Sequence, residues 1–257
     1  MTAGIGSPDR RNGSLLAPCL RPAGGAIILE LDEIRKHYGG IYAVDGVSFK
    51  IVEHTVTSLI GPNGSGKSTL FNSIAGEVKL DSGRVMLDGV EVQKRSPDKI
   101  ARLGIGRTFQ STQLFDQLTV FENLLAISQS PSRRQSIRRS LELLDFLDIA
   151  ELRHSRAGEL SYGQQKLLEI ARALILSPRL LLLDEPFAGI NPALQDRIVQ
   201  HLLTLSSQGV TILMIDHEMR IVLEVSDRVL VMDAGQLIAD GNPEEIRKND
   251  DVAKAYF

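Results

Sequence analysis

A glycine-rich segment between a short apolar run and a helix-like run constrains the fold more than any other feature of this chain. Residues 56–60 are β-branched and aliphatic, as in a buried strand, and residues 68–75 have the apolar spacing of a helix. A strand, a glycine-rich loop and a helix in this order predict an α/β domain whose loop binds phosphate. The loop and the turn after it comprise Gly61, Pro62, Asn63, Gly64, Ser65, Gly66, Lys67, Ser68 and Thr69.

The residue types of this loop suit a nucleotide. Gly61, Gly64 and Gly66 allow a tight turn that points backbone N–H groups at phosphate oxygens. The N-terminus of the following helix adds its positive dipole end. Lys67 is placed to reach the β- and γ-phosphates, and the Ser68 hydroxyl is a ligand for Mg²⁺. The segment therefore predicts a nucleotide site that includes Mg²⁺.

Two carboxylates follow an uninterrupted run of leucines. Residues 180–183 are all leucine, which is typical of a central parallel strand buried on both faces. Asp184 and Glu185 then lie at the carboxyl end of that strand, where open α/β sheets bind ligands. Asp184 is placed to hold Mg²⁺, directly or through water. Glu185 is placed to polarise a water molecule for in-line attack on the γ-phosphate.

A capped helix is predicted to begin at Ser161. Ser161 at the N-cap and Gln164 three residues later fit a capping box, and Pro178 follows the end of the helix over residues 165–174. Gly163 lowers the helix propensity of the first turn. A glycine there allows a ligand to approach the backbone, and a helix N-terminus attracts phosphate. The pattern predicts a helix start that also contacts a phosphate group.

These three segments, in this order, resemble the ATP-binding subunit of an ABC transporter. The resemblance implies the P-loop ABC ATPase fold, in which a mixed RecA-like sheet core carries an antiparallel β subdomain and an inserted α-helical subdomain. It implies ATP and Mg²⁺ as cofactors. It also implies that Ser161, Gly163 and Gln164 of one subunit cap the γ-phosphate bound to a second subunit, in a head-to-tail dimer with ATP between the subunits. The family usually has glycine where this chain has Tyr162, a side chain that we expect to point away from the phosphate.

Three further residues match positions of the family. Tyr38 falls where the family places an aromatic ring against adenine. The alternative interpretation is that Tyr38 is a structural tyrosine of the core. Gln110 matches the glutamine that reaches Mg²⁺ and the attacking water, and it opens the contact region with the membrane subunit. His217 resembles the histidine that hydrogen-bonds the γ-phosphate, and its alternative is a structural histidine. Asn191 stands where many members have aspartate, a change that removes a charge but keeps a side-chain carbonyl oxygen and adds an amide donor.

The composition of the chain argues against several classes of protein. The net charge of −3 gives no basic balance for nucleic-acid binding, and the single cysteine, Cys19, excludes an intramolecular disulfide. No apolar run approaches a membrane span. We expect a disordered tail over residues 1–25 and one ATPase domain over residues 26–257. Within that domain we expect a helical subdomain at about 97–175 and a helical tail at about 242–257.

Six stretches carry a closer resemblance: residues 106–110, 114–115, 119–125, 161–165, 188–192 and 251–256. They are similar to one subgroup, the ATPases of branched-chain amino acid importers. This closer resemblance implies uptake of branched-chain or hydrophobic amino acids, transmembrane permeases and a second, identical or homologous ATPase as partners, and indirectly a solute-binding protein. It places the chain at the cytoplasmic face of the cell membrane, with no nucleic-acid partner.

Alternatives stay open at this point. Related ATPases serve the transport of urea or short amides, or the export of lipopolysaccharide. A soluble ABC ATPase of DNA repair or of ribosomes usually has tandem units, coiled coils or zinc modules, and none is visible here. A GTPase would need an Asn-Lys-x-Asp motif, which the sequence does not contain. An inactive regulatory subunit is opposed by the presence of Lys67, Asp184, Glu185 and His217.

Overall fold

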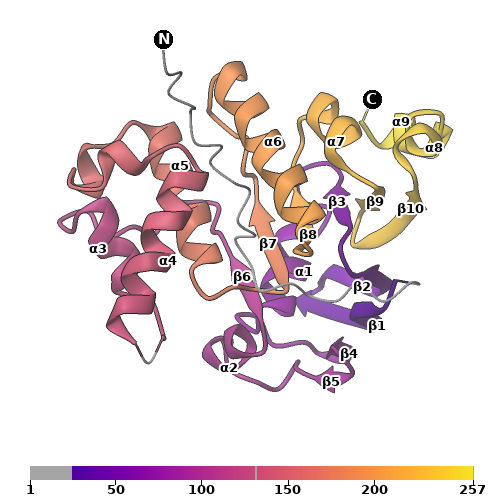
Figure 1. The fold of residues 1–257 in the computed structure, drawn as a ribbon. Coiled ribbons are helices and arrows are strands. Elements are labelled where there is room, and N and C mark those ends of the chain that lie inside the picture. The colour runs from indigo at the N-terminus through magenta and orange to yellow at the C-terminus, as the bar shows by residue number, and fades with distance from the viewer. Residues whose placement is uncertain (1–24, 131, 257) are drawn as a thin grey trace, which may run out of the picture.

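Two β-sheets form the centre of the protein, and helices cover them (Figure 1). The computed structural model describes residues 25–130 and 132–256. Apart from Gly25, the expected disordered tail over residues 1–25 lies outside the described residues. The antiparallel sheet has the order β2-β1-β4-β5 and consists of β1 (Ile27–Tyr38), β2 (Ile41–Val52), β4 (Ser82–Leu87) and β5 (Val90–Glu91).

The second sheet is mixed and has the order β10-β9-β3-β8-β7-β6. Strands β9, β3, β8, β7 and β6 run parallel, and only the edge strand β10 is antiparallel to its neighbour. The carboxyl ends of the parallel strands therefore meet at one edge of the sheet. The strands are β3 (Val56–Ile60), β6 (Ile105–Arg107), β7 (Leu180–Asp184), β8 (Thr211–Ile215), β9 (Arg228–Asp233) and β10 (Gln236–Gly241).

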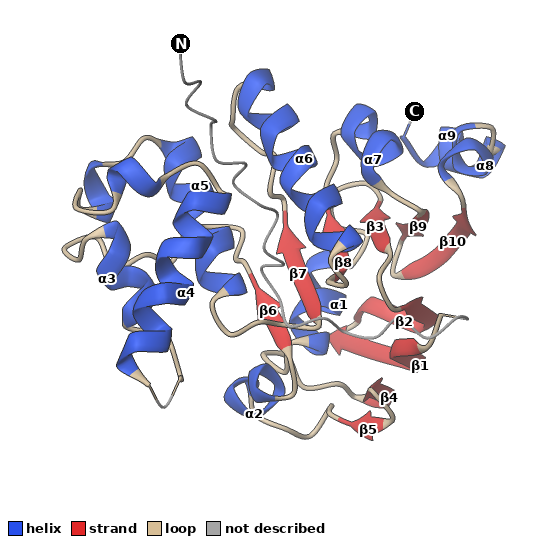
Figure 2. Ribbon diagram, in the orientation of Figure 1, coloured by secondary structure: helices blue, strands red, loops and turns tan. Residues whose placement is uncertain are grey.

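Helices lie around these sheets (Figure 2). Three of them, α3 to α5, form a separate group beside β6 and β7, whereas α6 and α7 lie along the mixed sheet. The helices are α1 (Lys67–Ile74), α2 (Pro97–Arg102), α3 (Val120–Leu125), α4 (Arg133–Phe146), α5 (Tyr162–Leu174), α6 (Pro192–Ser207), α7 (Met219–Val225), α8 (Pro243–Arg247) and α9 (Asp250–Tyr256).

The leucine run of β7 shows how the core is divided. Leu181 and Leu183 pack in one hydrophobic core with buried residues of α5, α6 and α7. Leu180 and Leu182 face the other core, which contains α1 and the inner face of the antiparallel sheet. Successive side chains of a strand point to opposite faces, so a strand covered on both sides is apolar throughout. The predicted burial of this strand on both faces is confirmed.

Strand β6 was not expected from the sequence. It lies within the stretch, from about residue 97, that reads as helical, yet it pairs in parallel with the start of β7. The strand has only three residues, one of them Gly106, and is therefore too short to show the alternating pattern of a strand. A Cβ atom at Gly106 would lie 2.4 Å from the carbonyl oxygen of Ala173, so close packing against α5 requires glycine here.

Candidate functional site

The glycine-rich loop between β3 and α1 is held between two other parts of the chain. Gly61 and Gly66 both have positive φ angles, 149° and 100°. A Cβ at Gly61 would lie 2.0 Å from the carbonyl oxygen of Met232, and one at Gly66 would lie 2.0 Å from that of Ala43. Glycine is therefore required at both positions by backbone angle and by space. Nothing lies within 4 Å of such an atom at Gly64, which faces open space.

Lys67 occupies the mouth of this loop. Its Nζ donates to the carbonyl oxygens of Gly61 and Pro62, both at 2.8 Å, and lies 3.4 Å from Ser65 Oγ. Burial lowers the pKa of Lys67, and the nearby carboxylates of Glu185 and Asp184 oppose that shift. Among the residues that the structure describes, the hydrogen-bond partners of the ammonium group are thus all neutral, and an anion entering the loop would meet it directly.

The other residues of the loop differ in their exposure to solvent. Asn63, Gly64 and Ser68 are exposed, whereas Pro62 and Thr69 are half-buried and Ser65 is buried. Helix α1 begins after Gly66 without a side-chain cap on its first N–H groups. A helix start that lacks a capping side chain leaves donors for water or a ligand.

Asp184 and Glu185 lie at the carboxyl end of β7, as predicted. Asp184 is 4% exposed, and its backbone N–H donates to Thr108 Oγ1 at 3.1 Å. Burial raises the pKa of Asp184, the guanidinium of Arg107 opposes this, and the charge of Glu185 adds to it. Glu185 has a positive φ of 48°, and its N–H donates to the carbonyl oxygen of Ile215 at 2.9 Å. This turn directs the two carboxylates to the same edge of the sheet.

Gln110 and His217 converge on Glu185 from two other strands. Gln110 follows β6, and its Nε2 lies 3.5 Å from Glu185 Oε2. His217 follows β8, and its Nδ1 lies 3.9 Å from Glu185 Oε1. Both partner side chains are exposed, so each is free to turn toward a ligand beside Glu185. Parallel strands β6, β7 and β8 thus bring together three residues that lie far apart in the sequence.

Asp216 is a buried carboxylate that the sequence reasoning did not select. It accepts hydrogen bonds from the N–H groups of His217 at 2.8 Å, Glu218 at 2.9 Å and Phe187 at 3.4 Å. Burial raises its pKa, and these backbone donors oppose the shift. Asp216 therefore ties the turn after Glu185 to the turn that carries His217. Its position directly before His217, at a strand end, was the signal that could have identified it.

Magnesium fits the donor set that the sequence predicted. The Ser68 hydroxyl, the Gln110 amide oxygen and the Asp184 carboxylate are the hard oxygen ligands that Mg²⁺ prefers. The Asp184 carboxylate accepts no hydrogen bond from any described residue, although the residue is buried. In the described part of the chain, no group of three or more His, Cys, Asp or Glu side chains forms a metal site. The chemistry of these three oxygen donors therefore fits Mg²⁺.

Ser161, Gly163 and Gln164 lie elsewhere. The predicted capping box is confirmed: Ser161 N–H donates to Gln164 Oε1 at 2.9 Å, and Gln164 N–H to Ser161 Oγ at 3.4 Å. Among described residues, no hydrogen bond or ion pair joins these three to the loop at residues 61–69. A Cβ at Gly163 would lie 2.3 Å from Leu194 Cδ2, so packing against α6 also favours glycine there.

Three other positions have clear structural settings. Tyr38, at the end of β1, is 52% exposed and lies beneath the Lys36 ammonium, 5.2 Å from the ring centroid, which excludes a core tyrosine. Tyr162 is exposed and borders Gly189. Asn191 is the N-cap of α6, where its Oδ1 accepts the N–H of Leu194 at 3.0 Å. An amide oxygen performs this capping role as well as a carboxylate does.

Comparisons with known proteins identify the family. The model of the family described as "ABC transporter" matches residues 44–188. The high-affinity branched-chain amino acid transport ATP-binding protein BraF of Pseudomonas aeruginosa is 42% identical over 248 residues, which cover 90% of this chain and 97% of that protein. A probable branched-chain amino acid transport ATP-binding protein, LivG of Methanocaldococcus jannaschii, is 40% identical over 86% of this chain and 92% of its own length.

Solved structures agree with this assignment. A nucleotide-free ATP-binding cassette from an ABC transporter has a TM-score of 0.83 and 39% identity, covering 90% of this chain and 99% of that one. A dimeric bacterial ABC transporter cassette has a TM-score of 0.77 and 27% identity, covering 84% and 99%. The expected α/β fold, with its mixed core sheet and its antiparallel sheet, is confirmed. The chain therefore belongs to the ABC transporter family and is an ATP-binding, ATP-hydrolysing cassette.

Proposed function

We propose that this chain is the ATPase subunit of an importer for branched-chain or hydrophobic amino acids. The relatives named above are branched-chain amino acid transport ATP-binding proteins, one of them described as probable, and they match the chain over nearly their full length. A transporter for urea or short amides, or a lipopolysaccharide exporter, is the alternative, because a nucleotide-binding subunit does not itself contact the cargo. The observation that carries the ATPase role is the convergence of Gln110, Glu185 and His217 beside the loop that holds Lys67.

ATP binding is assigned to the loop between β3 and α1. The backbone N–H groups of residues 61–69 surround the phosphates, and Lys67 exchanges its contacts with Gly61 and Pro62 for the β- and γ-phosphates. The exposed ring of Tyr38 stacks on adenine. Mg²⁺, held by Ser68, Asp184 and Gln110, would neutralise phosphate charge in the site.

Hydrolysis follows from the position of Glu185. Its carboxylate accepts a proton from a water molecule as the water oxygen attacks the γ-phosphorus, and the bond to the ADP oxygen breaks. Gln110 orients the same water molecule, because its amide already lies beside Glu185. His217 donates a hydrogen bond to a γ-phosphate oxygen. Asp216 keeps the backbone of His217 in place.

A second ATPase subunit completes each site. Ser161, Gly163 and Gln164 make no polar contact with their own chain's phosphate loop, and Ser161 is exposed at the N-terminus of α5. A helix N-terminus attracts phosphate, so these residues cap the γ-phosphate bound to the partner. The partner is either an identical or a homologous chain, arranged head to tail.

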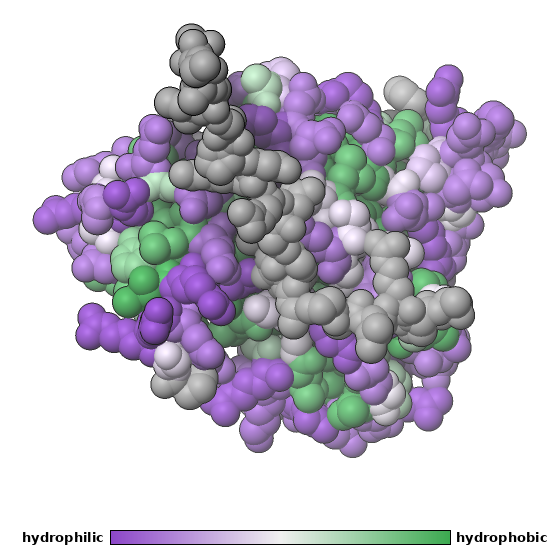
Figure 3. All heavy atoms as spheres, viewed as in Figure 1, coloured by the Kyte–Doolittle hydropathy of each residue, from purple (hydrophilic) through white to green (hydrophobic). Residues whose placement is uncertain are grey.

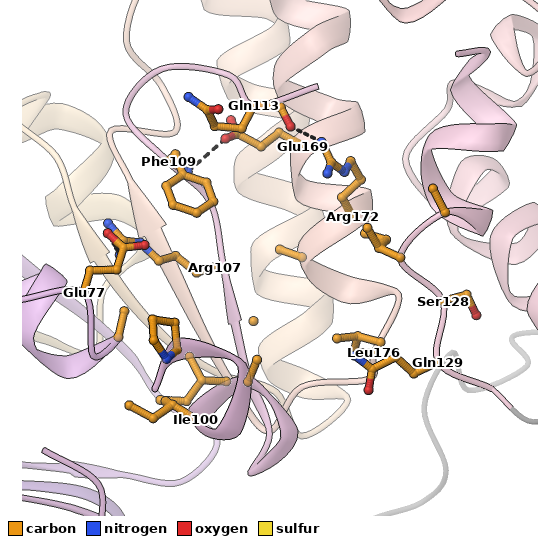
Figure 4. Close-up of a pocket in the computed structure, with 18 residues that line it drawn as sticks. Glu77, Ile100, Arg107, Phe109, Gln113, Ser128, Gln129, Glu169, Arg172 and Leu176 are labelled. Atoms are coloured by element: carbon orange, nitrogen blue, oxygen red, sulfur yellow. Dashed lines mark hydrogen bonds and ion pairs between the residues drawn. The ribbon is translucent and has the colours of Figure 1, made fainter. Parts of the chain in front are cut away.

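The permease contact is assigned to the segment from Gln110 to Phe115 and the groove beside it. The groove has a volume of about 470 Å³ and lies between α2 and the helices α3 and α5. Figure 4 shows apolar side chains of the groove, among them Ile100 and Leu176. Its charged side chains are Glu77, Arg107, Glu169 and Arg172. An amphipathic cytoplasmic helix of a permease fits a groove of this character.

The proposed location is the cytoplasmic face of the membrane, through contact with permeases and indirectly with a solute-binding protein. Among the described residues, no helix is long and apolar enough to cross a bilayer. The face drawn in Figure 3 is mostly hydrophilic, with hydrophobic residues in separate patches, one of them over the α3–α5 group. Attachment through a protein partner accounts for both features.

A pull-down of the tagged protein from detergent-solubilised native membranes tests this proposal. Mass spectrometry of the co-purified chains should identify multi-span permeases, a second ATPase and a solute-binding protein. The ligand of that binding protein, measured by titration with single amino acids, then identifies the cargo. Recovery of only soluble or ribosomal partners would contradict the transporter role and leave the ATPase assignment in place.

A further inference from the structure

Three charged side chains of α5 hold the segment that contains Gln110. We call Lys166, Glu169 and Arg172 the α5 triad. They are spaced by three residues, so they lie along one side of the helix. None of them was selected from the sequence, because their partners lie 56 to 60 residues earlier in the chain.

Side chains of the α5 triad contact backbone groups of residues 109–113. Phe109 N–H donates to Glu169 Oε1 at 2.9 Å, and Lys166 Nζ lies 3.4 Å from the carbonyl oxygen of Gln110. Arg172 donates to the carbonyl oxygen of Gln113, and its guanidinium lies 4.8 Å from the centroid of the Phe115 ring. Figure 4 shows the contacts of Glu169 and Arg172 side by side in the wall of the groove.

Stability does not explain two of these residues. Lys166 and Glu169 are 2% and 4% exposed, and their charged groups lie 3.5 Å apart. Burial raises the pKa of Glu169, although the N–H of Phe109 and the charge of Lys166 oppose that shift. A buried ion pair is often no more stabilising than apolar residues of similar volume. The remaining consequence of this pair is the position that it gives to residues 109 and 110.

That position matters for the site. The contacts to Phe109 N–H and Gln110 C=O fix the backbone on both sides of the Gln110 Cα atom. The Gln110 side chain then extends to Glu185. The same helix begins at Ser161, which in the proposed function meets the γ-phosphate of the partner subunit. Helix α5 therefore links Ser161, its N-cap, to the backbone of Gln110 and to the wall of the groove beside that segment.

We propose that Lys166 and Glu169 are positioning residues for Gln110, and that the α5 triad makes residues 109–115 move with α5 as one unit. This inference rests on the proposed ATPase role of Gln110 and Glu185. It adds a defined link between the start of α5 and the segment that meets the permease. Arg172 holds the far half of the segment, together with Asn123, whose Oδ1 accepts the Phe115 N–H at 2.9 Å.

The test uses the transporter complex with the double substitution Lys166→Met/Glu169→Leu, which replaces the pair with apolar side chains. We expect kcat for ATP hydrolysis to fall about tenfold while KM changes less than about twofold. Hydrogen exchange, followed by mass spectrometry, should become faster in a peptide covering residues 107–115. The midpoint of thermal unfolding should not fall, because no buried charge is left unpaired.

Glu169→Gln is the conservative variant, since its amide oxygen can still accept the Phe109 N–H. It should keep kcat within about threefold of the wild type. Glu142→Gln, on the exposed side of α4, is the matched control and should change nothing. Unchanged kcat or unchanged exchange in the double variant would overturn the proposal. An equal loss of kcat and thermal stability in both Glu169 variants would also overturn it. A wild-type complex without ATPase activity would instead refute the proposed function.

Discussion

The phosphate loop and the start of α5 are both glycine-containing helix N-termini, and they differ in how their N–H groups are satisfied. Helix α1 follows Gly66 without a side-chain cap, and Lys67 beside it is only partly exposed. Helix α5 is closed by the reciprocal hydrogen bonds of Ser161 and Gln164 and is exposed. The first N–H groups of α1 have no side-chain acceptor, so an anion can bind them. In α5, the capping residues already provide acceptors for the first turn. In the proposed function these two helix starts are the two halves of an ATP site, the phosphate loop on one subunit and the start of α5 on the other.

The largest effect on ATP hydrolysis is expected from replacing Glu185, the proposed general base. Glu185→Gln leaves the phosphate loop intact but gives up the group that accepts a proton from water. We expect turnover to fall about 100-fold to 10,000-fold, with ATP retained between the subunits. Steady-state phosphate release and light scattering of the ATP-bound complex measure both effects. Turnover at the wild-type rate would exclude Glu185 as the base.

Removing Lys67 should break binding itself. Lys67→Ala deletes the charge-assisted contacts to the β- and γ-phosphates and is expected to weaken ATP binding about 100-fold. Titration with a fluorescent ATP analogue measures the change in Kd. Lys99→Ala, an exposed lysine in α2, serves as the control and should bind like the wild type. Retention of wild-type affinity by Lys67→Ala would move the binding site away from this loop.

Asp184 offers a test in the opposite direction, toward higher stability. Asp184→Asn removes a buried charge and should raise the unfolding free energy of the nucleotide-free chain by about 1–2 kcal/mol at neutral pH, while ATP hydrolysis is lost. Burial raises the folded-state pKa, so stability from this group is present below the unfolded pKa and is lost as pH rises through the folded pKa. The stability advantage of the variant should therefore shrink as the pH falls through the raised folded-state pKa toward the unfolded-state pKa of about 3.9.

Chemical denaturation at several pH values measures this difference. Asp145→Asn, at an exposed position of α4, is the control and should show no such dependence. A variant that is less stable than the wild type at neutral pH would show that the carboxylate stabilises the empty site.

The smallest effect is expected at Asn191. Asn191→Asp keeps the acceptor that caps α6, so both stability and ATPase activity should stay close to wild type, within about 0.5 kcal/mol in unfolding free energy. Asn191→Ala should cost about 1 kcal/mol. Thermal unfolding and phosphate release follow the two variants. A large gain of activity in Asn191→Asp would show that a carboxylate at this position has a role beyond capping.

Local signals in the sequence predicted much of this structure. The leucines of β7, the cap at Ser161 and the glycines of the phosphate loop each act through neighbouring residues, so their patterns were readable. Strand β6 was too short to show a period. The contact between Glu169 and Phe109 spans 60 residues, and only the folded chain brings the two together. The resemblance, not the periodicity, supplied the roles expected for Gln110 and His217.

The central claim is that the phosphate loop and the start of α5 of one chain act in different ATP sites. Its most direct test is ATP binding by the dilute, isolated chain carrying Ser161→Ala. Ser161 makes no polar contact with its own phosphate loop, so we predict a Kd for labelled ATP within about twofold of the wild type, alongside a marked loss of hydrolysis in the assembled complex. Ser161→Asn, which keeps the helix cap, controls for fraying of α5. A loss of binding as large as that of Lys67→Ala in the dilute chain would contradict the account, because it would place both halves in the same site of one chain.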